Sequence, residues 1–203
     1  MSQAPLENAA WVTVSVACSA TALIEFVQNL ERLFRLNPYL EIRQWKEEST
    51  QGAAKKIQFN ALNEMNGVNY DLTLDFSQIT AQEFVVHYSA SFKERLEIKI
   101  TDTAPCATLT LIERYRKLPA NEHQRHLQEV DQGLTPWAVS IKNYIEGLAR
   151  WGRLPLYRWY KEKFWLSMSP RHRRIARLLL WTTVLEFIVF FFVFIIYWLE
   201  AAR

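Results

Sequence analysis

The chain has 203 residues, with 24 Lys and Arg against 21 Asp and Glu, so its formal net charge is only +3. It has only two cysteines, which excludes a small domain held together by disulfides. The charge is unevenly distributed, because residues 1–149 carry a net charge of −4 and residues 150–177 carry +8. The acidic part offers no basic face for nucleic acid, so we expect no nucleic-acid partner.

The first predicted elements are a strand and a helix. Valines alternate with small or polar residues from Val12 to Val16, which is typical of a strand with one apolar face. Ser19 is a suitable helix N-cap, and apolar residues from Leu23 to Phe34 follow helical spacing. We expect a single helix that ends before Pro38, because the residue preceding a proline avoids the α region.

Six more alternating segments predict strands, at about residues 40–45, 57–61, 68–76, 84–88, 96–100 and 109–112. Asn66 and Gly67 form a strong hairpin signal between two of them. The short connections predict an antiparallel meander. A second helix is expected from near Asp131 to near Arg150, and it should start close to Pro136 because proline is tolerated only in a first helical turn.

This order of elements resembles that of a known superfamily. Residues 14–17 (VSVA) lead into Ser19-Ala20 and a helix, and residues 26–32 (FVQNLER) lead to the turn at 36–39 (LNPY). The order of the elements and these local sequences resemble the START-like superfamily, also called the Bet v 1-like or SRPBCC (polyketide cyclase/dehydrase and lipid transport) superfamily. The resemblance implies an α+β helix-grip fold over residues 10–150, with an antiparallel sheet wrapped on a long C-terminal helix.

The resemblance also implies an apolar cavity between the sheet and this helix, for a hydrophobic small molecule such as a lipid, isoprenoid, sterol or polyketide. The sequence itself places aromatic side chains on the inward face of the predicted elements: Phe59, Tyr70, Phe76, Phe84, Tyr88 and Trp137. We assign these six to the ligand cavity. The alternative is that they simply fill the core, as aromatic stripes usually do.

Signals for catalysis, metals and cofactors are weak. His123 and His126 lie three residues apart, but no cysteine or carboxylate cluster completes a metal site. His87, on a strand, is expected to be exposed or satisfied, and the charged segments 94–99 and 113–117 are expected to form ion pairs on the solvated face of the sheet. We therefore expect no catalytic residue, no metal and no cofactor, and a cyclase-type enzyme is the least supported alternative.

Residues 178–199 (LLLWTTVLEFIVFFFVFIIYWL) predict a transmembrane helix, because 22 residues span about 33 Å. Basic residues concentrate on its N-terminal side, which predicts that the N-terminal domain lies in the cytoplasm and that the helix is anchored in the inner (cytoplasmic) membrane. The alternative, a buried core helix, conflicts with so long a run of large apolar residues.

The preceding segment, residues 151–177, combines aromatic and basic side chains, which suits the lipid headgroup region. We expect its membrane-interface residues to be Trp159, Tyr160, Trp165, Arg171, Arg173 and Arg174. The alternative is that the segment packs on the domain or on a partner.

Glu186 is the one charge inside the predicted span, with Thr182 and Thr183 about one turn before it. A carboxyl group in lipid is costly, so we expect these residues to contact a transmembrane partner or a second copy. The alternative is a polar position that the helix tolerates.

The sequence thus favours a membrane-tethered, non-enzymatic protein that binds or carries a hydrophobic small molecule at the cytoplasmic face of the membrane. The alternative is an accessory or assembly subunit of a membrane complex, which docks through the transmembrane helix and the segment before it.

Overall fold

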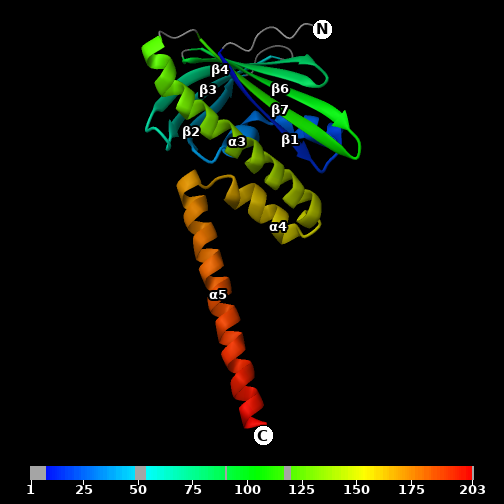
Figure 1. Ribbon diagram of the computed structural model, residues 1–203. Coiled ribbons are helices and arrows are strands. Elements are labelled where there is room, and N and C mark those ends of the chain that lie inside the picture. Colours follow the sequence, from blue (N-terminus) through cyan, green and yellow to red (C-terminus); the bar gives the residue numbers. More distant parts are fainter. Residues whose placement is uncertain (1–7, 49–53, 90, 117–119, 203) are drawn as a thin grey trace. The chain divides into compact units, whose positions relative to one another are not determined.

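The computed structural model describes residues 8–48, 54–89, 91–116 and 120–202, and for residues 120–132 it describes the backbone only (Figure 1). The chain forms two compact units, Met1–Ser167 and Met168–Arg203. Each unit is described by itself below.

The first unit is built on one antiparallel sheet of seven strands, as the alternating segments predict. The strands are β1 (Ala9–Val16), β2 (Leu40–Glu48), β3 (Lys55–Asn63), β4 (Asn69–Thr80), β5 (Glu83–Tyr88), β6 (Lys93–Thr103) and β7 (Cys106–Tyr115). Their order in the sheet is β1-β7-β6-β5-β4-β3-β2, so the first strand pairs with the last. Strands β2 to β7 are connected as a meander, and β1 and β2 form the two edges.

The hairpin between β3 and β4 turns at Gly67, as predicted. Gly67 has a φ of +72°, a left-handed conformation that glycine adopts without a Cβ penalty. The backbone N–H of Gly67 donates to the carbonyl of Asn63 at 2.8 Å, and the Asn66 side chain accepts from the N–H of Val68 at 3.0 Å. This turn lies beside the pocket described below.

The predicted first helix is two helices, α1 (Ala20–Gln28) and α2 (Leu30–Arg35), so the prediction of one helix is wrong. Ser19 caps α1 as expected, and its hydroxyl accepts from the N–H of Ala22 at 3.2 Å. The break falls at Asn29, whose side chain accepts from the N–H of Arg32 at 3.0 Å and thereby starts a new helix. The apolar positions Phe26, Leu30 and Leu33 remain buried on both sides of the break.

The long helix α3 (Ala120–Trp151) lies across the sheet in Figure 1. It begins well before the predicted start, and Pro136 lies inside it, so the prediction that the helix starts near this proline is wrong. Pro136 removes one backbone hydrogen bond, but Leu134, Trp137 and Ile141 around it are all buried. Packing of this face outweighs the local penalty. The sheet and α3 together form the helix-grip α+β fold that the sequence predicts.

Two short helices follow α3 in the same unit. They are α4 (Pro155–Trp159) and the π-helix η1 (Tyr160–Trp165). Leu166 is buried, and the Glu162 carboxylate lies 4.0 Å from the Arg32 guanidinium of α2. Part of this segment therefore packs on the domain.

The second unit contains helix α5 (Pro170–Ala201), which begins with Ser169 as its N-cap. It is longer than the predicted span of residues 178–199. It is the one described helix that is long and apolar enough to cross a bilayer, and none of its most apolar window is buried.

Candidate ligand-binding site

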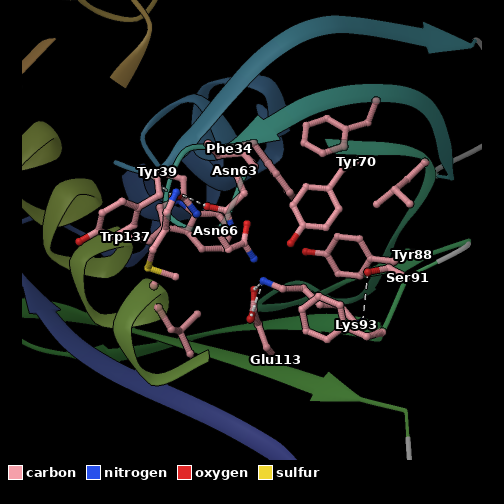
Figure 2. A pocket seen from close by; sticks show the side chains of 18 residues that line it. Phe34, Tyr39, Asn63, Asn66, Tyr70, Tyr88, Ser91, Lys93, Glu113 and Trp137 are labelled. Atoms are coloured by element: carbon pink, nitrogen blue, oxygen red, sulfur yellow. Dashed lines mark hydrogen bonds and ion pairs between the residues drawn. The ribbon is translucent and has the colours of Figure 1, made fainter. Parts of the chain in front are cut away.

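A pocket lies between the sheet, helix α2 and helix α3 (Figure 2). Its apolar wall is an aromatic cluster in which the Phe34 ring lies 5.7 Å from Phe59 and 5.4 Å from Trp137, both edge-on. The Trp137 indole N–H donates to the carbonyl of Leu33 at 2.9 Å, which fixes α3 to the end of α2. Leu72 of β4 and Leu134 of α3 complete this wall.

The opposite wall of the pocket is polar, and its centre is an ion pair. The Lys93 ammonium lies 2.7 and 2.8 Å from the two carboxylate oxygens of Glu113, and the Tyr115 hydroxyl donates to the same carboxylate at 2.5 Å. The Glu113 side chain is only 4% exposed, whereas the Lys93 side chain is 24% exposed. A buried carboxylate is thus paired with an ammonium that still reaches solvent, which limits the cost of desolvation.

A β-bulge turns Lys93 into the pocket. On β6, Arg95 pairs with Arg114 of β7, but Lys93, two residues earlier, pairs with Tyr115, one residue later, so Glu94 is the extra residue. Residues paired across a sheet lie on the same face, and Leu96 pairs with Glu113 on the inner face. Without the bulge, Lys93 would lie on the outer face with Arg95. The bulge places its ammonium beside Glu113.

Two tyrosine hydroxyls point toward the centre of the pocket, near the Lys93 ammonium (Figure 2). They belong to Tyr70, which is half-buried, and Tyr88, which is 6% exposed. Within the part of the chain that the structure describes, neither hydroxyl has a hydrogen-bond partner. Burial, and secondarily the Glu113 carboxylate and Tyr70, raise the pKa of Tyr88 well above its ordinary value. Tyr88 therefore stays a neutral hydrogen-bond donor at physiological pH.

Small polar side chains at the pocket belong to turns and stabilise them. Asn37 accepts from the N–H of Tyr39, Asn63 accepts from the N–H of Met65, and Ser91 accepts from the N–H of Lys93, all at 3.0–3.2 Å. These hydrogen bonds stabilise the loops around the pocket, so the role of these three side chains is structural.

The pocket is small. Its cavity volume is about 60 Å³, whereas sites for drug-sized molecules usually reach at least about 300 Å³. A cavity of this volume fits a small group rather than a whole lipid.

Four of the six aromatics that the sequence assigns to the cavity line this pocket: Phe59, Tyr70, Tyr88 and Trp137. The other two, Phe76 and Phe84, are buried elsewhere in the core, where their rings stack at 5.9 Å. A role of any of the six in ligand binding stays a prediction.

Sequence patterns do not identify Lys93 and Glu113 as pocket residues, and the prediction that Glu113 lies on the solvated face is wrong. Glu113 continues the inward series of Leu109 and Leu111 on β7, so alternation alone could have found it. The predicted ion pairs form at Glu97, with Arg95 and, across the strands, with Arg114, although Glu97 is buried rather than solvated. Burial would raise the pKa of Glu97, but the two guanidinium groups outweigh it and lower the pKa. His87 is exposed, as expected.

The predicted interface residues differ in exposure. Trp159 and Tyr160 are exposed, Trp165 is half-buried, Arg171 and Arg174 are exposed, and Arg173 is buried. The Lys161 ammonium lies 4.4 Å from the centre of the Trp165 ring and 5.7 Å from that of Tyr157, so these two rings flank a cation.

The predicted partner-contact residues of α5, Glu186, Thr182 and Thr183, are all exposed. The Thr182 hydroxyl donates to the carbonyl of Leu178 at 3.1 Å, so it is satisfied within its own helix. Elsewhere, the described residues contain no cluster of three His, Cys, Asp or Glu side chains that could hold a metal ion. His123 and His126 lie where only the backbone is described.

Comparison with solved structures identifies the fold. A START superfamily protein from Mycobacterium smegmatis is 16% identical, with a TM-score of 0.52 over 69% of this chain and 98% of that one. The Zhui aromatase/cyclase from Streptomyces sp. R1128 is 15% identical, with a TM-score of 0.52 over 70% of this chain and 93% of that one.

The di-domain ARO/CYC StfQ of the steffimycin biosynthetic pathway is 10% identical, with a TM-score of 0.55 over 70% of this chain and 52% of that one. The chain therefore has the START/Bet v 1-like fold, as the sequence resemblance predicts. Comparison of the sequence with protein-family models and with curated proteins found no match.

Proposed function

We propose that this chain is a membrane-tethered, non-enzymatic protein that binds a hydrophobic small molecule at the cytoplasmic face of the inner membrane. The observation that carries the proposal is the pocket between the sheet and α3, with its aromatic wall of Phe34, Phe59 and Trp137. Apolar pockets with a few convergent polar groups are the usual form of a small-molecule site. Two proteins with a similar fold are named as aromatase/cyclases, which supports a cyclic or apolar ligand.

Helix α5 supports the membrane part of the proposal. It is 32 residues long, and its most apolar window is fully exposed, which is unfavourable in water. Lipid around this helix removes that cost. The excess of basic residues before the span supports a cytoplasmic location for the domain.

The segment before α5 supports a position close to the bilayer. The exposed large apolar residues between the end of α3 and α5 are Trp151, Leu154, Leu156, Trp159, Tyr160 and Phe164. Only four residues separate the end of η1 at Trp165 from the start of α5 at Pro170. A membrane-spanning α5 therefore holds these aromatics within reach of the headgroup region, where such rings are favoured.

Gly133 provides the test of pocket binding. It lines the pocket, and a Cβ built on it meets no atom within 4 Å. Gly133→Phe should place a ring in the pocket and block it, while Gly133→Ala should leave it open; both should raise helix stability. The full-length chain is purified in mild detergent, and bound small molecules are identified by native mass spectrometry. We expect a bound apolar molecule with wild type and Gly133→Ala and its loss with Gly133→Phe. The same molecules bound to all three would contradict pocket binding.

The small volume of the pocket favours a second candidate function, that of an accessory or assembly subunit of a membrane complex. A cavity of about 60 Å³ is nearly filled by its own side chains. In this case the exposed Glu186 and the aromatics of α4 and η1 contact a partner. Proteins that co-purify with the wild-type chain and with Gly133→Phe alike, in the absence of a bound small molecule, would favour this candidate.

A further inference from the structure

The charges on the polar wall of the pocket restrict the charge that a ligand can have. Among the side chains that the structure describes, its only charged lining residues are Lys93 and Glu113, and these two neutralise each other at 2.7 Å. A carboxylate or phosphate ligand would have to compete with Glu113 for Lys93 and would meet a buried carboxylate of like charge. A cationic ligand would meet the Lys93 ammonium. The pair therefore disfavours a charged group of either sign.

The same wall also has hydrogen-bond donors for which the described residues provide no acceptor. Glu113 occupies two of the three N–H donors of the Lys93 ammonium, which leaves one. The hydroxyls of Tyr88 and Tyr70 point toward the same space and have no partner among the described residues (Figure 2). A hydrogen bond from one of these hydroxyls to a ligand oxygen would contribute about 0.5–1.5 kcal/mol. Three donors thus converge where one acceptor fits.

We propose that this pocket is specific for an uncharged, oxygen-bearing head, a carbonyl or hydroxyl on an otherwise apolar ligand, which accepts hydrogen bonds from Tyr88 and Lys93. This inference rests on the proposed small-molecule binding and names its ligand class. The apolar body of the ligand packs against Phe59, Leu134 and Trp137, opposite the donors. Glu113 neutralises the charge of Lys93, so the pocket does not favour anions. The Tyr70 hydroxyl is a further hydrogen-bond donor to the same ligand oxygen.

The test uses three single-ring probes that differ in the head: 4-fluoroacetophenone, with a carbonyl; 4-fluoroethylbenzene, without oxygen; and 4-fluorobenzoate, an anion. Each is titrated against the full-length chain in lipid nanodiscs and followed by ¹⁹F NMR, with protein-free nanodiscs as the control for partition into lipid. We expect the acetophenone to bind about 3- to 10-fold more tightly than the ethylbenzene, as one hydrogen bond would give, and the benzoate to bind most weakly.

Two variants assign the effect to the proposed donors. Tyr88→Phe should reduce the preference for the acetophenone to about 2-fold or less and leave binding of the ethylbenzene unchanged. Tyr144→Phe, which removes a hydroxyl outside the pocket that has no partner among the described residues, should change neither. Glu113→Gln leaves Lys93 without a carboxylate partner and should make the benzoate the tightest of the three probes, with circular dichroism as the check that the variant folds.

The outcomes separate the two proposals. Equal binding of acetophenone and ethylbenzene to the wild type, or a preference that survives Tyr88→Phe, overturns the head-group inference and leaves pocket binding in place. Tightest binding of benzoate to the wild type overturns the requirement for an uncharged head. Binding of none of the three probes overturns this inference and counts against small-molecule binding itself.

Discussion

Phenylalanine side chains occupy opposite environments in the two units of this chain. In the first unit Phe34 and Phe84 are 2% and 0% exposed, whereas in α5 Phe187 and Phe190 are each 68% exposed. The first unit buries its apolar surface within itself, so the hydrophobic effect in water stabilises it. Helix α5 buries none of its apolar window, so water is an unfavourable solvent for it.

The carboxylates of the two units differ in the same way. Glu113 is buried with an ammonium and a phenol as partners inside its own unit. Glu186 lies on an apolar helix and makes no ion pair with any described residue. The first unit satisfies its buried carboxylate internally, whereas the second leaves a polar group for lipid, water or another protein to satisfy.

Removal of α5 should have the largest effect. A chain that ends at Ser167, the boundary between the units, should move from the membrane fraction to the soluble fraction and keep its α/β circular dichroism spectrum. The sequence alone suggests an earlier end at Arg150, but that end would remove the buried Leu166 and the Glu162 that lies near Arg32. A Ser167-terminated chain that stays on membranes would show that α4 and η1 suffice for attachment.

Breaking the pocket ion pair should have the next largest effect. Lys93→Met leaves Glu113 buried without its cation and should lower the free energy of unfolding by about 3 kcal/mol. The matched control is Lys99→Met on the same strand, because Lys99 pairs with Glu83 at 3.3 Å and both side chains are more than 40% exposed. That loss should stay below about 1 kcal/mol. Urea unfolding of the full-length chain in mild detergent, followed by tryptophan fluorescence, measures both; equal losses would contradict the buried role of Glu113.

Substitutions of Glu186 test whether helix α5 associates with another transmembrane helix. Glu186→Leu should leave membrane insertion intact and weaken association with a neighbouring transmembrane helix by about 0.6–2 kcal/mol, because one hydrogen bond in the bilayer is lost. Glu186→Gln should retain more of the association, since glutamine can also donate. Apparent mass on native gels is the readout. If the leucine variant keeps the wild-type mass and partners, Glu186 is a tolerated polar position and α5 is a plain anchor.

The smallest effect is expected at Tyr144, whose buried hydroxyl has no hydrogen-bond partner among the described residues. Tyr144→Phe removes this unsatisfied group and should leave stability unchanged or raise it by up to about 1 kcal/mol. The matched control, Tyr115→Phe, removes a hydroxyl that donates to Glu113 and should cost about 1–2 kcal/mol. A loss at Tyr144 as large as that at Tyr115 would mean that its hydroxyl has a partner.

Much of the fold follows from local sequence signals. The seven strands alternate clearly, the Asn66-Gly67 turn has residues that the backbone requires, and Ser19 caps a helix as predicted. The errors arise where non-local packing competes with a local rule. Pro136 should end or start a helix, but the buried face of α3 carries the helix through it. Asn29 divides the first helix because its side chain caps the second one.

The apolar half of the pocket could be predicted, but the polar half could not. Phe59, Tyr70, Tyr88 and Trp137 are inward-facing aromatics by spacing alone. Glu113 follows the same alternation, although its charge argued for the solvated face. Lys93 could not be found by spacing, because the bulge at Glu94 shifts it by one position relative to the rest of β6.

The bulge makes the electrical neutrality of the pocket depend on a count of residues as well as on their identity. If Glu94 paired with Tyr115 and the two-residue repeat of β6 continued without a bulge, Glu94 would lie on the inner face and Lys93 on the outer face, with every pocket side chain still encoded. Glu113 would then face a second carboxylate in place of its cation. The unpaired residue Glu94 therefore decides which face of the sheet Lys93 occupies. It thereby decides whether the charge of Glu113 is neutralised in the pocket.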